Sequence, residues 1–208
     1  MKDNFGLYTT LDRLFGGDPA SVLTLDEFLK GLEGRSYAFA IMALNMPNIV
    51  PSGIPWLSTV TGVPILILLA QFFSGRLVPS LPRAIGCRGL SRGKLQTFLK
   101  RAHRYIDWLE NAVHARYEWW VNGMPRRLLL AAWVINAVIL ALPIPFDNLF
   151  PSIAILFFCF ALIEDDGLMA MLGWLFTAIT AVWTVFLLMV GHAAVIAALG
   201  VLRDFIFG

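Results

Sequence analysis

The stretch SYAFAIMALNMPNIVPSGIPWLSTVTGVPILILLAQFFSG, from Ser36 to Gly75, decides the fold because it is apolar, uncharged and broken by proline. A second stretch, LLLAAWVINAVILALPIPFDNLFPSIAILFFCFALI from Leu128 to Ile163, has the same design and a single charge, Asp147. Each has an apolar leg, a break with proline and asparagine, and a second leg that starts at Pro64 or Pro151. Lipid tolerates such breaks only where protein or water shields the freed polar groups. We therefore interpret the two stretches as a repeat of broken helices, as found around the sites of transporters.

The composition places the chain in a membrane. Hydrophobic residues make up 58% of the 208 residues and the mean hydropathy is +0.72, whereas soluble domains hold about 45–50% apolar residues. The first apolar run starts at Ser36 after a mostly polar segment, so we expect no cleavable signal peptide and a cytoplasmic N-terminus. The expected location is the bacterial inner (plasma) membrane, crossed several times. Cys87 and Cys159 are expected to be free thiols.

The lengths of the apolar legs favour hairpins that enter the membrane and return on the same side. Forty helical residues would measure about 60 Å, twice the hydrocarbon core of a bilayer. The proline-free legs Ser36–Met46 and Pro64–Gly75 reach roughly halfway across, and the legs Leu128–Leu142 and Pro151–Ile163 behave alike. A re-entrant hairpin fits these lengths better than two full kinked spans, which stay the alternative. Pro64 and Pro151 are read as helix starts inside the membrane.

Residues 76–127 are basic, with eleven Lys and Arg against three acidic residues. A basic loop between apolar segments indicates the cytoplasmic side, with anionic lipid headgroups as its partner and no role in nucleic-acid binding. Within it, a heptad-like helix over residues 94–120 is predicted to pack on the cytoplasmic ends of the hairpins, and a homodimer contact is the second option. Its predicted seam consists of Leu95, Leu99, Ala102, Ile106, Leu109, Val113 and Trp120.

With the N-terminal and C-terminal regions, the chain divides into five predicted segments. Thr24-Leu-Asp-Glu27 has the spacing of a capping box and begins a short amphipathic helix, which could lie on the bilayer or on the basic helix. Residues 168–190 could cross the membrane once, and Gly191-His192 is predicted to break the run before a short last helix. The segments are a cytoplasmic N-terminal region (1–35), the first hairpin (36–75), the basic region (76–127), the second hairpin (128–167) and a C-terminal membrane segment (168–208).

Asp147 is the candidate functional group of the second break. An ionisable residue inside a membrane is by default part of a pathway or proton relay, but Asp147 could equally cap the helix that starts at Pro151. Asn48 and Asn148 occupy similar places in the two breaks. The predicted helix starts would point positive ends into the membrane and favour an anion or a polar oxygen, with help from serine and threonine hydroxyls. The candidate site is Asp147, Asn148, Asn48 and Ser152, with Arg35 and Arg76 at its cytoplasmic entrance.

Other constellations point away from catalysis. His103, Asp107, Glu110, His114 and Glu118 share one helix face, but nearby Arg104 and Arg116 oppose a metal, so we interpret the face as solvated. The acidic run Glu164-Asp-Asp-Gly167 could form an ion-pair latch with Arg35, Arg76 or Arg127. Since the sequence offers no nucleophile–base pair and no phosphate-binding glycine loop, we expect neither an enzyme nor a bound metal or cofactor.

The order of these motifs resembles the bacterial ExoD family. The matching residues are Gly31-Leu-Glu-Gly-Arg35-Ser36, Gly62-Val-Pro64, Gln71, Gly75-Arg76, Leu81-Pro82, Pro125-Arg126, Pro143-Ile-Pro145, Asn148, Pro151 and Glu164-Asp-Asp-Gly167, within about residues 25–190. Ser80 departs from the pattern, where an aromatic residue is expected, and so does the spread of prolines across the first break. The resemblance implies an inner-membrane protein connected with exopolysaccharide production and tolerance of alkaline conditions, and it brings no established reaction.

Together these observations predict an all-α polytopic membrane protein with two proline-broken, re-entrant-like hairpins and a cytoplasmic amphipathic helix. Both hairpins are expected to point the same way, as a parallel repeat about the membrane normal. The expected function is a small transporter or channel-like protein for an ion or small polar solute, an anion or a proton-coupled species. The rival is a non-transporting accessory subunit that scaffolds the machinery of polysaccharide synthesis or export.

Overall fold

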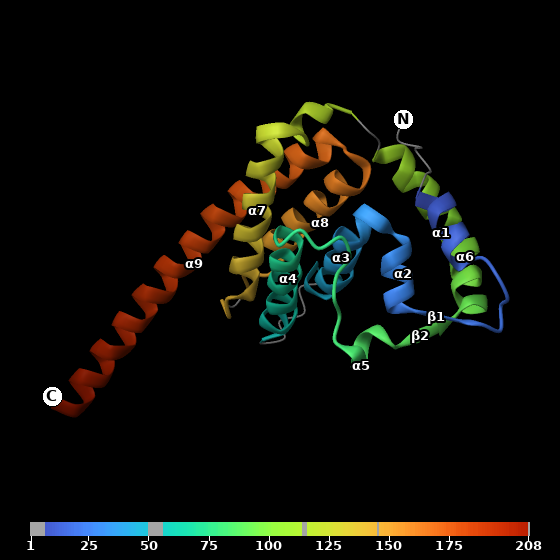
Figure 1. The fold of residues 1–208 in the computed structure, drawn as a ribbon. Helices are drawn as coiled ribbons and strands as arrows, with labels where there is room; N and C mark the ends of the chain where they lie inside the picture. Colours follow the sequence, from blue (N-terminus) through green and yellow to red (C-terminus); the bar gives the residue numbers. More distant parts are fainter. Residues whose placement is uncertain (1–6, 50–55, 114–115, 145, 208) are drawn as a thin grey trace.

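The computed structural model describes residues 7–49, 56–113, 116–144 and 146–207, and over these residues it is mostly helical (Figure 1). The expected all-α class is correct in the main, and the one addition is a small two-stranded sheet. Pro51, Pro55, Pro145 and His114 lie outside the described residues. A bundle of apolar helices occupies one part of the molecule, and a smaller group of elements, which we call the arm, lies beside it (Figure 1).

Five helices form the bundle, and the two hairpins interlock within it. In the first hairpin α3 contacts α4, and in the second α7 contacts α8. Across the hairpins α3 contacts α8 and α4 contacts α7, so each helix has a partner in both hairpins. Helix α9 lies on α8 and α7 (Figure 1). The helices are α3 (Ser36–Ile49), α4 (Leu57–Phe73), α7 (Gly123–Ala141), α8 (Leu149–Glu164) and α9 (Gly167–Phe207).

The bundle encloses a tightly packed apolar core. Trp133 of α7 and Phe158 of α8 are among its largest fully buried side chains. Glycine allows a close helix contact across the hairpins, because a Cβ added at Gly62 would lie 2.8 Å from the backbone of Ala141. Close packing of such side chains stabilises the bundle through many small van der Waals contacts. The core therefore fixes the relative position of the two hairpins and of the polar breaks that they carry.

The prolines sit differently from expectation in the first hairpin. Helix α4 begins at Leu57, so Pro64 lies inside a helix and the predicted helix start there is wrong. In an apolar setting the backbone favours a helix, since all other N–H and C=O groups are then bonded within the segment, and proline deletes only one such bond. Pro47 likewise lies within α3. Pro151 falls in the first turn of α8, as predicted.

Two helices within the described residues are long and apolar enough to cross a membrane: α7, with 19 residues, and the part of α9 from Gly167 to Ala193. Only 33% of the most apolar window of α7 and 17% of that of α9 are buried inside the protein. A core helix of a soluble protein would be mostly buried. The outward-facing apolar surface is therefore consistent with a membrane protein.

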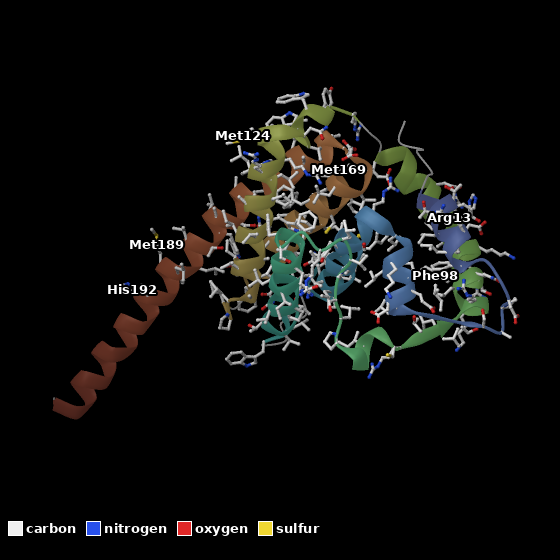
Figure 2. The ribbon with its side chains drawn as sticks, viewed as in Figure 1. Arg13, Phe98, Met124, Met169, Met189 and His192 are labelled. Carbon is white, nitrogen blue, oxygen red and sulfur yellow. The ribbon has the colours of Figure 1, made fainter. Side chains whose placement is uncertain are left out.

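Helix α9 is continuous, so the predicted break at Gly191-His192 is wrong. It runs for 41 residues, or about 61 Å at 1.5 Å per residue. A single glycine inside a helix costs only about 1 kcal/mol, which apolar neighbours with good helix propensity offset. Figure 2 shows Met189 and His192 on the part of α9 that extends away from the other bundle helices.

The arm is built from short elements around α6. Helix α1 packs on α6, and strands β1 and β2 pair in antiparallel fashion, with Val22 opposite Ser91 (Figure 1). Figure 2 shows Arg13 and Phe98 in this region, apart from the bundle. The elements are α1 (Leu7–Phe15), β1 (Val22–Thr24), α2 (Leu25–Gly31), η1 (Glu33–Arg35), α5 (Arg83–Gly86), β2 (Gly89–Ser91) and α6 (Arg92–Ala112). The short helix η2 (Glu118–Trp120) follows α6 and contacts α7 and α9 of the bundle.

The predicted basic helix exists as α6, but it ends at Ala112, short of residue 120, and it packs only in part as expected. Leu99 is buried with Phe15 and Leu23, so the apolar seam of α6 faces α1 and β1. The last two residues of the predicted seam, Val113 and Trp120, lie beyond α6 and pack with the core of the bundle, as expected. The side chain of Arg92 fixes the contact of α6 with α1, because its guanidinium donates to the carbonyls of Leu14 and Gly16 at 2.7 Å. The sequence prediction went wrong because α1, which covers the seam, was not expected.

The predicted capping box is present at the start of α2. The backbone N–H of Glu27 donates to the hydroxyl of Thr24 at 3.3 Å, and the N–H of Thr24 donates to the Glu27 carboxylate at 3.1 Å. These hydrogen bonds hold the pKa of Glu27 below its ordinary value, since they stabilise the charged form. Phe28 of α2 packs in one cluster with Leu99 of α6, which agrees in part with the second of the two placements expected for α2, but the elements that α2 contacts most are α3, β1 and α5.

Candidate functional site

Asp147 lies in the loop between α7 and α8 and is only 1% exposed. Its Oδ2 accepts a hydrogen bond of 2.8 Å from the hydroxyl of Thr184 on α9. Its Oδ1 has no hydrogen-bond partner among the described residues. Neither carboxylate oxygen therefore caps α8, which is the structural role that the sequence had left open.

Hydrogen bonds connect this loop to α3 and α8. The side-chain amide of Asn45 on α3 donates to the carbonyl of Ser152 at 2.7 Å. The Ser152 hydroxyl in turn donates to the carbonyl of Asn148 at 2.6 Å, next to Asp147 in the chain. We call Asn45, Asp147, Asn148, Ser152 and Thr184 the break network. It joins α3, α8, α9 and the second break, and three of its five members were predicted.

Asn48 lies one turn after Asn45 and is 1% exposed. Its side-chain amide donates to the hydroxyl of Thr61 at 2.7 Å, and that hydroxyl donates to the carbonyl of Leu57 at 2.9 Å. Asn48 thus bonds within its own hairpin, while Asn148 accepts within α8. The expected pairing of two equivalent asparagines is replaced by Asn45, which forms the hydrogen bond between the hairpins.

Three buried oxygens in this region are left without a partner by the described residues: Oδ1 of Asn45, of Asn48 and of Asp147. We call them the orphaned oxygens. The orientation of the Asn45 amide is fixed because its nitrogen donates to a backbone carbonyl, which can only accept. The Asn48 amide is oriented by Thr61, whose hydroxyl donates to the carbonyl of Leu57 and so accepts from the Asn48 nitrogen. An unsatisfied buried polar group costs about 1–3 kcal/mol. This end of the bundle therefore offers acceptors to a donor or a cation.

A second row of polar groups lies between α7 and α9. The side-chain amide of Asn136 donates at 2.8 Å to the carbonyl of Ala132 and to the hydroxyl of Thr177. Thr180 and Thr184 continue the row and are buried. The sequence interpretation missed these residues. A signal was available, because threonines at positions i, i+3 and i+7 of an uncharged helical stretch share one face.

Strained aromatic residues mark both breaks. Trp56, just before α4, has φ 70, and Phe146, just before Asp147, has φ 64. Bulky residues rarely adopt a positive φ, which costs about 1–3 kcal/mol and is common at functional sites. The indole N–H of Trp183 donates to the Phe146 carbonyl at 3.1 Å. Consecutive residues of α9, Trp183 and Thr184, therefore hold consecutive residues of the break.

Arg35 and Arg76 do not join the break network. Arg35 directly precedes α3 and Arg76 follows α4, so both lie at the helix ends opposite to the breaks. The guanidinium of Arg35 is 3.7 Å from the carboxylate of Glu164, at the C-terminal end of α8. The structure thus forms the predicted ion-pair latch with Arg35, and it separates the arginines from the other four predicted site residues.

Asp166 forms a second connection at this charged end and is fully buried. Both of its carboxylate oxygens lie 3.3 Å from Nε of Arg116, and one of them accepts from the N–H of Leu168 at 2.8 Å. The carboxylate therefore joins the segment before α7 to the first turn of α9. A carboxylate in this position also interacts favourably with the helix dipole.

The Asp166→Ala variant is expected to lower the free energy of unfolding by about 2–4 kcal/mol, because it removes a helix cap and a charged hydrogen bond from a buried position. Chemical unfolding of purified protein in detergent measures this change. Asp107→Ala is the matched control, since the Asp107 side chain is 43% exposed in its pair with His103. A change within about 0.5 kcal/mol is expected there, and equal losses in both variants would contradict the role given to Asp166.

The acidic and histidine residues of α6 form an exposed pair rather than a metal site. Nδ1 of His103 is 2.6 Å from Oδ2 of Asp107, and the ring of Tyr8 packs edge-on against His103 at 4.5 Å. Among the described residues, no group of three or more His, Cys, Asp or Glu is placed to hold a metal ion. Cys87 is an exposed free thiol and Cys159 a buried one.

The apolar helices, the outward-facing apolar surface and the buried polar breaks define a helical protein of the membrane type. The family model described as exopolysaccharide synthesis, ExoD, matches residues 7–186, and the chain belongs to this family. It is 28% identical to Protein ExoD of Rhizobium meliloti (strain 1021), over 96% of this chain and 83% of the relative. It is 26% identical to an uncharacterized protein of Synechocystis sp., over 94% and 92% of the two chains. No solved structure matches it significantly.

Proposed function

We propose that the chain is a small transporter or channel-like protein of the inner (plasma) membrane, and that it carries an ion or a small polar solute. The observation that carries the proposal is the buried carboxylate of Asp147, which has one orphaned oxygen and is the single charge of the stretch Leu128–Ile163. Buried ionisable groups in membrane helices are costly and mark ion or substrate pathways. The family description supports a link with exopolysaccharide synthesis, and the resemblance adds tolerance of alkaline conditions.

The helix lengths favour hairpins that cross the membrane completely. Because Pro47 and Pro64 lie inside helices, the legs are longer than the proline-free runs that suggested re-entrant hairpins. Helices α3, α4, α7 and α8 contain 14, 17, 19 and 16 residues, or about 21–28 Å each. These lengths approach the thickness of the hydrocarbon core, about 30 Å. The charged ends would then face the cytoplasm and the breaks would face the other side.

The packing of the hairpins supports a parallel repeat. A two-fold axis along the membrane normal would exchange α3 with α7 and α4 with α8. Under this rotation, the contact between α3 and α8 becomes a contact between α7 and α4. The structure contains both contacts. Repeats of this kind place their sites where broken helices meet. The break network lies at such a meeting of α3 and α8.

Helix α9 offers a way to control the site. Thr184 donates to the Asp147 carboxylate, and Trp183 donates to the carbonyl of Phe146. A small displacement of α9 would break both hydrogen bonds and expose the carboxylate to solute from the side of the breaks. The conformational change that transport requires would then be a movement of α9 against the two hairpins.

Purified protein in liposomes tests this function, with radioactive or fluorescent tracers for alkali cations, protons and small anions. A transporter moves at least one of them faster than protein-free vesicles do, with no other protein present. If no tracer moves, and the protein supports polysaccharide output in cells only together with the synthesis or export machinery, the proposal is wrong. The scaffold role, with that machinery as partner, would then take its place.

A further inference from the structure

We propose that the break network and Asn48 form a site for a hard alkali cation, with Na⁺ as its probe. This inference rests on the proposed function, for which it names the class of solute. The inference is based on the orphaned oxygens, which are three buried acceptors. Two are amide oxygens on neighbouring turns of α3, and the third is the carboxylate oxygen of Asp147 in the loop before α8. Hard cations bind oxygen ligands from carboxylates, amides and hydroxyls.

The unsatisfied groups at the breaks are mainly acceptors. At the breaks the orphaned atoms of Asn45, Asn48 and Asp147 are acceptors, while each amide nitrogen already donates. Two buried donors without a partner in the described part of the chain lie elsewhere: the hydroxyl of Tyr37 in the first turn of α3 and the indole N–H of Trp133 within α7. The unpartnered hydroxyl of Thr59, in the first turn of α4, lies at the breaks and can accept as well as donate. A site built to hold an anion would show the opposite arrangement, with donors at the breaks.

The charges at the breaks also favour a cation. The N-terminal ends of α4 and α8 lie there and carry positive partial charge, which was the reason to expect an anion. The C-terminal ends of α3 and α7 lie at the same breaks, however, and carry negative partial charge of similar size. The sequence places no lysine or arginine in either hairpin, so Asp147 decides the sign of the field.

An alkali cation fits better than a proton relay. A relay needs a chain of titratable groups, as in pumps and transporters, and Asp147 is the only Asp, Glu, Lys or Arg of the stretch Leu128–Ile163. The other polar groups around it are amides and hydroxyls, which coordinate a cation without changing protonation. In broken-helix transporters, helix C-terminal ends and unwound carbonyls coordinate Na⁺ in the same manner.

Thermal unfolding of the full chain in detergent tests the inference, with NaCl compared with choline chloride at equal ionic strength. Na⁺ at ten times its dissociation constant is expected to raise the melting temperature by about 3–6 °C. Exchange of chloride for gluconate should change nothing. Asp147→Asn should lose the shift, Asn48→Ala should weaken Na⁺ binding about fivefold, and Asp107→Asn in the arm should keep the shift of the unmodified chain.

Two results would overturn the cation site: no shift with Na⁺, Li⁺ or K⁺ in the unmodified chain, or an equal shift in Asp147→Asn. Failure of the proposed transport function would give a different set of results from failure of the cation site. A Na⁺ shift that depends on Asp147 together with vesicles that move no tracer would keep the site and remove the transporter. Vesicles that move only anions would keep the transporter and remove the cation site.

Discussion

The Asp147→Asn variant is expected to fold normally and to lose at least about tenfold in the initial rate of ion uptake into vesicles, which corresponds to about 1.4 kcal/mol. Asparagine has the size of aspartate, and its amide oxygen can still accept the hydrogen bond from Thr184. The variant removes the negative charge that makes the buried break attractive to a cation. Tracer uptake per amount of reconstituted protein measures the loss.

Asp107→Asn is the matched control for this variant, because it makes the same chemical change on the exposed face of α6. Its uptake rate should equal that of the unmodified protein. Circular dichroism and the elution volume in detergent should be the same for all three proteins, so that a loss of uptake reports the site and not the fold. Uptake at the unmodified rate in Asp147→Asn would remove Asp147 from the pathway.

Gly62→Ala is expected to reduce the free energy of unfolding by about 1–3 kcal/mol through overpacking. The added Cβ would lie 2.8 Å from both Cα and N of Ala141, closer than such atoms approach one another. Because the obstacle is backbone, α4 and α7 must move apart. Elsewhere in a helix the same exchange stabilises by about 1 kcal/mol, since alanine has the higher helix propensity. Unfolding in detergent measures the difference.

Gly191→Ala supplies the comparison. An added Cβ at Gly191 would meet nothing within 4 Å among the described residues, so this variant should be as stable as the unmodified protein or slightly more stable. If Gly62→Ala proves equally stable, the close contact between the two hairpins does not exist. The interlocked packing that brings Asn45 to Ser152 would then need revision.

The sequence reveals those parts of the fold that depend on local chemistry. The capping box at Thr24 and the helix start near Pro151 are confirmed, because both satisfy backbone groups within one turn. The breaks expected at Pro64 and at Gly191 are wrong for a shared reason. A residue with low helix propensity costs one hydrogen bond or about 1 kcal/mol, and the apolar surroundings recover more than that by keeping the helix continuous.

The candidate site was only partly predictable. Asp147 stands out in the sequence because it is the single charge of its stretch, and Ser152 and Asn148 follow it closely. Asn45 and Thr184 reach the same network from α3 and α9. Their roles depend on which helices pack together, and hydrophobic periodicity does not determine that when the helices are apolar on every side. Only the spacing of the threonines on α9 was readable as a signal.

Sided labelling of single cysteines in intact cells tests most directly that the hairpins carry the break network across the membrane. Cysteines replace Arg35, Arg92, Asp165 and Phe146 one at a time, in a background where Cys87 and Cys159 are changed to serine and alanine. We expect Phe146, which is 78% exposed, to react with an impermeant reagent from outside, and the other three positions to react only after the cells are opened. Labelling of Arg35, Arg92 or Asp165 from outside would contradict the parallel arrangement, and protection of Phe146 from outside would restore the re-entrant hairpin.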